Sequence, residues 1–319
     1  MTAQVAIHDL GTLGASGAFS QAKAVNRLGQ VVGTSRDGLG RSRAFLWSET
    51  GGIADLKPSA GVSSSANDIN ERGEIVGGGD TGFGDFHAYL ISEGLSFDLG
   101  TLGGNESEAL ALNRLGQVAG HSRSSGGLAK HAFFIREPGE MLDLGTLGGA
   151  TSVAHDVNER GEVVGLAEMG SGRPHAFLWT ATDGMRDLGT LGGAVSVALG
   201  INGRTEVVGG SGRAFLWTER SGMVDLGTLG GRTSCANDVN DHGYIVGASQ
   251  TGETDHRGLP LTHAFLRTPD GRILDLGTLG GEHSSAAAVS DGNDVLWVAG
   301  HSHDVAGCIR AVLWAVRVD

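Results

Sequence analysis

Two titratable residues, Lys23 and His155, occupy the same position in two copies of a repeated segment, each three residues before an asparagine. The other copies place neutral residues there, namely Asn67, Leu110, Leu199, Asn237 and Ala287. A scaffold alone would not need that variety. A lysine and a histidine in one pocket can exchange protons with a ligand, which is general acid–base chemistry. Lys23 and His155 are therefore candidate catalytic residues, and Asn67 and Asn237 are candidate ligand-binding residues.

Further polar residues occur in some copies of the repeat and not in others. His121 and His301 hold equivalent positions and are the other two catalytic candidates. The remaining candidates for ligand binding are Glu106, Glu168, Glu282, His283 and His303. The stretch HSHD at 301–304 suggests a divalent metal ion, although two histidines spaced in this way are a weak signal. We predict no required cofactor and assign no metal ligands. The alternative is that these charges are simply solvated.

A repeated heptapeptide determines how these residues are positioned. DLGTLGG stands at 98–104, 143–149, 187–193, 225–231 and 275–281, with the variants DLGTLGA at 9–15 and DLKPSAG at 55–61. The aspartates that begin these copies are separated by 46, 43, 45, 44, 38 and 50 residues. A period of about 44 residues is typical of the four-stranded blade of a β-propeller.

Each repeat contains four β-prone segments. In SVAHDVNERGEVVG (152–165) two such segments flank a turn, and Asn158 and Gly161 suit the first and fourth positions of a type I turn. HAFLW (175–179) and MRDLG (185–189) supply the third and fourth segments. GTLGG then returns the chain to the axis, because glycine tolerates positive φ and close backbone approach.

The ends of the chain predict a closed ring. One β-prone segment precedes Asp9 and three follow Asp275, so the two ends together supply one complete blade. Closure removes the open edges of a β-array. We therefore predict an all-β fold, a single domain over residues 1–319, and a seven-bladed propeller of four-stranded blades in which the N-terminal strand completes the C-terminal blade.

The recurring HAFLW…DLGTLGG unit, with HAF at 131–133, 175–177 and 263–265, resembles the bacterial HAF-repeat family over essentially the whole chain. Members of that family are mostly predicted extracellular repeat proteins whose biochemical role is poorly defined. The resemblance implies a β-propeller and supplies no catalytic residue to carry over.

A ring of polar residues precedes the AF of each unit and is predicted to be structural. Its members are Arg43, His87, His131, His175, Arg213, His263 and Arg310. Three of the histidine units also carry an aspartate two residues before the turn asparagine (Asp68, Asp156 and Asp238), which predicts that this carboxylate orients the imidazole. The aspartates of the heptapeptide are predicted to accept backbone N–H groups.

Composition limits the classes of partner. The formal net charge is −13 and only three lysines occur, so nucleic-acid binding is disfavoured. No apolar run is long enough to span a membrane, and two cysteines cannot form a disulfide framework. The start of the chain does not resemble a signal peptide, so we expect a cytoplasmic protein, or an extracellular one if a leader has been removed.

Function is expected where the repeats differ. The favoured hypothesis is a small-molecule enzyme of lyase, cyclase or hydrolase type, with its pocket at the axial mouth of the propeller. The alternatives are a non-catalytic scaffold that binds a protein partner, and a glycan-binding repeat protein. The variable loops contain few aromatic residues, Phe83 and Phe86 among them, which favours the enzyme.

Overall fold

The computed structural model describes residues 4–15, 17–58, 61–127, 129–137, 139–292 and 295–317. These residues form 28 strands joined by turns and bends, and no part of them is helical. The described residues therefore contain no helix with the length and apolar character of a membrane span.

The strands pair in antiparallel groups of four, and we call each group a blade. The first half of the chain contributes β1 (Gln4–Asp9), β2 (Ser20–Val25), β3 (Val31–Arg36), β4 (Ser42–Ser48), β5 (Gly52–Asp55), β6 (Ser64–Ile69), β7 (Ile75–Asp80), β8 (Phe86–Ser92), β9 (Leu95–Asp98), β10 (Gly103–Leu112), β11 (Val118–Ser124), β12 (Lys130–Ile135), β13 (Met141–Asp143) and β14 (Gly148–Val157). The second half contributes β15 (Val163–Met169), β16 (Pro174–Thr180), β17 (Gly184–Asp187), β18 (Val197–Ile201), β19 (Val207–Gly210), β20 (Ala214–Thr218), β21 (Gly222–Asp225), β22 (Ser234–Val239), β23 (Ile245–Thr254), β24 (Pro260–Arg267), β25 (Ile273–Asp275), β26 (Gly280–Val289), β27 (Leu296–Asp304) and β28 (Ile309–Arg317).

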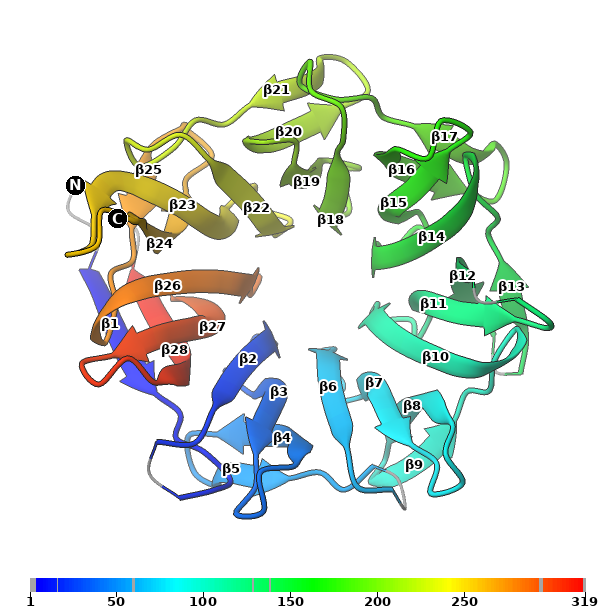
Figure 1. Cartoon of the computed structure of the whole chain (residues 1–319), viewed down its shortest axis with the longest axis horizontal. Helices are drawn as coiled ribbons and strands as arrows, with labels where there is room; N and C mark the ends of the chain where they lie inside the picture. The colour runs from blue at the N-terminus through cyan, green and yellow to red at the C-terminus, as the bar shows by residue number, and fades with distance from the viewer. Residues whose placement is uncertain are drawn as a thin grey trace.

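The blades are arranged around a central axis, with the first strand of each blade innermost (Figure 1). The blades β2–β5, β14–β17 and β18–β21 are separate sheets. Single parallel bridges join the others in pairs: Glu106 with Phe86 links β6–β9 to β10–β13, and Thr262 with His283 links β22–β25 to the blade of β26, β27, β28 and β1. This arrangement is a β-propeller, as the repeat predicted.

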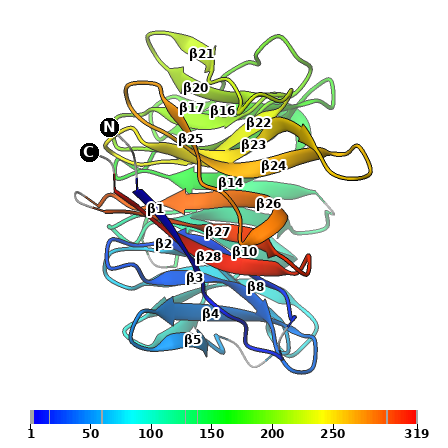
Figure 2. The same ribbon diagram turned by 90° about the vertical axis from the view of Figure 1, so that its left-hand side faces the viewer.

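The two ends of the chain meet in one blade. β1 pairs antiparallel with β28, from Gln4 opposite Arg317 to Asp9 opposite Val312. Figures 1 and 2 both show β1 alongside β28. The backbone N–H of Ala311 donates to Ser20 Oγ at 2.9 Å, and the same alanine-to-serine bond recurs between successive blades along the chain. The expectation that the N-terminal strand completes the last blade is confirmed.

Hydrogen bonds between side chains and the backbone hold the heptapeptide at the corner between blades. Asp98 Oδ1 accepts the N–H of Gly100 at 2.8 Å, and Gly100 has a φ of +73°, which glycine adopts without steric cost. Ser107 Oγ donates to the carbonyl of Gly100 at 2.6 Å, and Thr101 Oγ1 donates to that of Gly104 at 2.8 Å. The predicted role of the heptapeptide aspartates as acceptors of backbone N–H groups is confirmed.

The histidines before AF connect the third and fourth strands of their own blades. His87 Nδ1 on β8 lies 2.8 Å from Asp98 Oδ2 at the end of β9. The same contact joins His131 to Asp143, His175 to Asp187 and His263 to Asp275. The structural role is therefore as predicted, but the predicted partners Asp68, Asp156 and Asp238 are wrong. The imidazole reaches the adjacent outer strand, whereas those aspartates lie on the innermost strand.

Asp68, Asp156 and Asp238 connect neighbouring blades instead. Asp68 Oδ2 accepts the N–H of Leu112 in the next blade at 2.8 Å, and Oδ1 accepts the N–H of Ile69. Asp156 and Asp238 bind Ile201 and Val289 in the same way, and we call these three contacts the aspartate clasps. Burial raises the pKa of Asp68 to about 7 and that of Asp238 to about 6.

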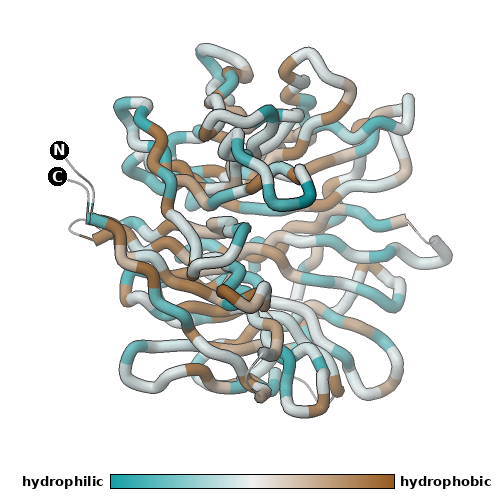
Figure 3. Tube along the Cα trace, turned by 60° about the vertical axis from the view of Figure 1, so that its left-hand side comes forward, coloured by the Kyte–Doolittle hydropathy of each residue, from teal (hydrophilic) through white to brown (hydrophobic). Residues whose placement is uncertain are grey.

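The apolar core lies between adjacent blades. Its largest fully buried side chains are Trp314, Phe45, Phe133, Phe177 and Phe215. Apolar stretches run along the strands, and many of the turns are polar (Figure 3). Each blade therefore buries both faces against its neighbours, which makes the inner strands a rigid frame for the residues that face the axis.

Candidate functional site

A β-bulge in each innermost strand determines which side chains face the axis. The pairing of β14 with β15 shifts register between Ala154 and Asp156, so His155 is the extra residue. The same shift leaves out Lys23, Asn67, Leu110, Leu199, Asn237 and Ala287 in the other blades. A bulge re-aims the side chain of its extra residue and is common beside active sites.

The bulge residues line one axial pocket of about 310 Å³, which is at the small end of the range for ligand sites. Its lining consists of Lys23, Asn67, Leu110, His155, Leu199, Asn237 and Ala287. The structure therefore brings four of the candidate residues together. The candidates Glu106, Glu168, Glu282, His283 and His303, and the histidines His121 and His301, are not part of this lining.

Lys23 contributes an amine with a neutral hydrogen-bond partner. Its Nζ donates to Asn67 Oδ1 at 2.5 Å. Among the described residues, no carboxylate lies within ion-pair distance of this nitrogen. Burial lowers the pKa of Lys23, and the charge of Glu108 opposes that shift only in part. The amine is thus more easily deprotonated than a surface lysine.

Glu108 on β10 lies behind Asn67 and fixes its orientation. Glu108 Oε1 accepts hydrogen bonds from Asn67 Nδ2 at 2.9 Å and from Ser65 Oγ at 3.0 Å. Gly78 makes room for Phe86 and Glu108, because a Cβ there would lie 2.3 Å from the Phe86 ring and 3.0 Å from Glu108 Cγ. The comparison of the repeats indicates Glu108, like Glu106, as a carboxylate present in one copy only, but Glu108 was not assigned to the site.

His155 carries a buried nitrogen that nothing in the described chain satisfies. Its Nε2 is inaccessible to solvent and has no hydrogen-bond partner. Burial lowers the pKa of His155 to about 4, and the charge of His121 adds to the shift. The imidazole is therefore neutral at physiological pH. An unsatisfied buried polar atom in a pocket is where a ligand group can form a hydrogen bond.

His121 and Glu106 belong to a charged cluster between β10 and β12. His121 Nε2 lies 3.2 Å from Lys130 Nζ, and Glu106 forms ion pairs with Arg123, at 2.9 Å, and with Lys130. Burial lowers the pKa of His121, and the charge of Lys130 lowers it further. These contacts join neighbouring strands and account for Glu106 and for Nε2 of His121, whereas Nδ1 of His121 is buried and has no hydrogen-bond partner among the described residues.

His301 and Glu168 also form contacts within the sheet structure. Gln21 Nε2 lies 3.2 Å from His301 Nδ1. This contact links β2 to β27 of the neighbouring blade. Glu168 Oε2 accepts the backbone N–H of Ala150 at 3.1 Å. Neither residue is brought to the axial pocket.

His283 and His303 meet between β26 and β27. Their ring centroids are 5.2 Å apart at an interplanar angle of 88°. His283 Nδ1 accepts the backbone N–H of Thr262 at 3.2 Å. At this angle the two rings meet edge to face. Burial lowers the pKa of His303, and the charge of His283 lowers it further.

Glu282 belongs to the one described group of side chains that could hold a metal ion. Its carboxylate, Asp255 and His256 place their potential ligand atoms within 4.8 Å of one another. Asp255 Oδ1 already accepts the N–H groups of Arg257 and Leu259, and its Oδ2 binds the Arg257 guanidinium at 2.9 Å. A divalent ion would compete with that guanidinium, so the residues fit a metal poorly.

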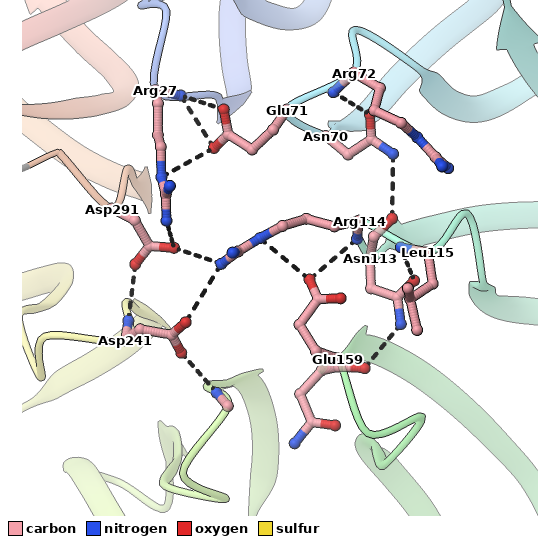
Figure 4. Close-up of polar contacts among 12 residues, drawn as sticks. Arg27, Asn70, Glu71, Arg72, Asn113, Arg114, Leu115, Glu159, Asp241 and Asp291 are labelled. Atoms are coloured by element: carbon pink, nitrogen blue, oxygen red, sulfur yellow. Dashed lines mark hydrogen bonds and ion pairs between the residues drawn. The ribbon is translucent and has the colours of Figure 1, made fainter.

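The opposite end of the axis is occupied by ion pairs between the first turns of the blades (Figure 4). Arg114 reaches Asp291 Oδ2 at 3.0 Å, Asp241 Oδ2 at 3.3 Å and Glu159 Oε1 at 3.4 Å. Arg27 pairs with the same Asp291 oxygen at 3.3 Å. One guanidinium therefore connects blades on both sides of the axis, and the same turns line a cavity of about 170 Å³.

Comparison with known proteins supports the fold. No family model matches the chain. No curated protein matches it either. Two structures of puromycin hydrolase are similar, with TM-scores of 0.57 and 0.55, identities of 14% and 13%, and coverage of 91% of this chain. The match spans about half of the hydrolase chain (52% and 51%). A gluconolactonase from Xanthomonas campestris is 13% identical, with a TM-score of 0.43 over 99% of this chain and 90% of that one. Likeness at this level of identity concerns the fold alone.

Proposed function

We propose that the chain is a closed seven-bladed propeller that binds a small molecule in the axial pocket and catalyses a proton-transfer reaction there, of lyase, cyclase or hydrolase type. The observation that carries this proposal is the convergence of an unpaired lysine and an unsatisfied histidine on one pocket. Titratable groups with shifted pKa values in a cleft are typical of catalytic sites.

Each lining residue has a distinct part in this reaction. Lys23 and His155 exchange protons with the ligand, since burial shifts the pKa of each toward the neutral form. Asn67 orients the Lys23 amine. Asn237 donates through Nδ2 to the carbonyl of Ala286 at 2.7 Å, and its Oδ1 can accept a hydrogen bond from the ligand. Leu110, Leu199 and Ala287 supply apolar walls.

A screen of small molecules by ligand-observed NMR tests the binding part of the proposal. Leu199→Trp fills the pocket, whereas Leu95→Trp, at a position 63% exposed on the outer strand β9, is the matched control. Ligands should bind the wild type and Leu95→Trp and fail to bind Leu199→Trp. Hits that bind all three proteins equally would place the binding site elsewhere.

Kinetics test the catalytic part once a substrate is known. Lys23→Met and His155→Gln should each lower kcat by about 100-fold or more, the usual contribution of a general acid or base. Lys57→Met, which replaces an exposed lysine of a return loop, should leave kcat unchanged. Equal activity of Lys23→Met and Lys57→Met would contradict the assignment.

A protein-interaction scaffold is the second candidate function. Several loops between second and third strands carry exposed apolar side chains at their tips: Leu39, Phe83, Leu259 and Val305. Phe83 is 95% exposed, and exposed aromatic residues are frequent binding hot spots. Phe83→Ser would abolish binding of a protein partner while leaving the axial pocket intact. A glycan-binding role has no comparable support beyond the family resemblance.

A further inference from the structure

We propose that Lys23 forms a covalent imine with an uncharged aldehyde or ketone bound in the axial pocket. The inference rests on the proposed function, because it names the ligand class of the same pocket. It follows from the surroundings of the amine and from the other residues that line the pocket.

The Lys23 amine lies in an unusual place for a lysine. It is bonded to a neutral amide oxygen, Asn67 Oδ1, and it faces the pocket. The other two lysines differ: Lys130 forms an ion pair with Glu106, and Lys57 is exposed. A lysine held out of water without a carboxylate partner tends to lose its proton, and the neutral amine is the nucleophilic form.

The reaction balances with groups present in the pocket. The lone pair of Lys23 Nζ forms a bond to the carbonyl carbon, and the carbonyl π electrons move to oxygen. One proton leaves the nitrogen and one reaches the oxygen, which gives a carbinolamine. The second proton of the nitrogen and the hydroxyl group then leave as water, which forms the C=N bond. His155 is the other titratable residue of this lining and carries the proton between nitrogen and oxygen.

The composition of the lining favours an uncharged ligand. Lys23 and His155 are the only titratable residues of the lining, and burial shifts the pKa of each toward its neutral form. A bound carboxylate would lie among neutral side chains and near the charge of Glu108, which acts on the Lys23 amine, and burying a charge in such surroundings is costly. Leu110, Leu199 and Ala287 instead offer apolar contacts to a short hydrocarbon body.

Reductive trapping on the unmodified protein tests the proposal. The protein is incubated at pH 7 with propanal and cyanoborohydride, which reduces an imine to a stable secondary amine, and digested for mass spectrometry. The chain contains three lysines, so Lys57 and Lys130 serve as internal controls. We expect Lys23 to be labelled faster than Lys57, since burial lowers the pKa of Lys23 and so raises the fraction of neutral, nucleophilic amine. Labelling of Lys57 and Lys130 without Lys23 would overturn the proposal.

Two further arms separate this inference from the proposed function. Leu199→Trp should suppress labelling of Lys23 and leave labelling of Lys57 unchanged, which ties the adduct to the pocket. If the NMR screen detects ligands that Leu199→Trp excludes but wild-type Lys23 gives no adduct, the pocket stands and the imine is refuted. Labelling of Lys23 by pyruvate as fast as by propanal would refute the uncharged ligand class.

Discussion

Replacing Gly165 by alanine should disrupt both the blade and the pocket. Gly165 pairs with Ala154, beside the bulge that exposes His155. A Cβ at this position would lie 1.9 Å from the carbonyl oxygen of Val153 and 2.9 Å from the ring of Phe177. Real Cβ contacts are more than one ångström longer, and the obstructing atom belongs to the backbone. The innermost strand must therefore move, and the bulge with it.

The free energy of unfolding should fall by about 3 kcal/mol, the upper part of the range for overpacking a core. Urea denaturation of the wild type and the Gly165→Ala variant measures this difference. Gly38→Ala is the matched control, because its Cβ would meet nothing within 4 Å. That substitution should change stability by about 0.5 kcal/mol or less. A loss below about 1 kcal/mol in Gly165→Ala would refute the steric argument.

The same variant reports on function. Because the first strand would shift, the buried Nε2 of His155 should become accessible to solvent, and the pKa of His155 should rise from about 4 toward its ordinary value. NMR titration of the histidine side chains measures that change. If Gly165→Ala is destabilised but the pKa of His155 is unchanged, the surroundings of His155 do not depend on the position of the bulge, and the argument is contradicted.

Four other perturbations have defined outcomes. The pKa of Asp68 is raised in the fold, so the folded state binds the proton of this carboxyl more tightly than the unfolded state does. The free energy of unfolding should therefore fall by more than about 1 kcal/mol as pH rises from 4 to 7, and urea titrations of Asp68→Asn should show a smaller decline. The pKa of His155 is lowered in the fold, so the free energy of unfolding of the wild type should fall by on the order of 2 kcal/mol relative to that of His155→Gln as pH falls from 6.5 to 4. A difference between the two proteins that stays constant over this pH range would contradict this. Arg114→Ala should cost about 1 kcal/mol, since its ion pairs are partly exposed, and should reduce the dependence of the melting temperature on salt. Deleting β1 leaves β28 as an open edge, and light scattering should detect self-association that the full chain lacks.

The repeat made the architecture predictable. Its period, its glycine turns and its complementary ends identified the strands and the pairing of β1 with β28. Comparison between copies also isolated Lys23 and His155, because a position that varies within a repeated scaffold is not needed for the scaffold. The four candidates that meet in the axial pocket share that one position.

Contacts between copies were not predictable in the same way. Asp68 and His87 occur in the same repeat, yet Asp68 binds the next blade and His87 binds Asp98. Sequence spacing does not reveal which face of a strand a side chain occupies once a bulge shifts the register. Glu108 was not assigned to the site for a related reason, since its hydrogen bonds to Asn67 and Ser65 cross from one blade to the next.

The aspartate clasps impose a hierarchy on the ring. They tie β6–β9 to β10–β13, β14–β17 to β18–β21, and β22–β25 to the blade of both termini, which leaves β2–β5 with Ala24 at the corresponding place. By this contact alone, the ring divides into three pairs of blades and one single blade, β2–β5. If local unfolding follows this division, the blade β2–β5 opens independently of the others. This is the blade that carries Lys23. Amide exchange in β2 would then mark the route by which a ligand reaches the amine.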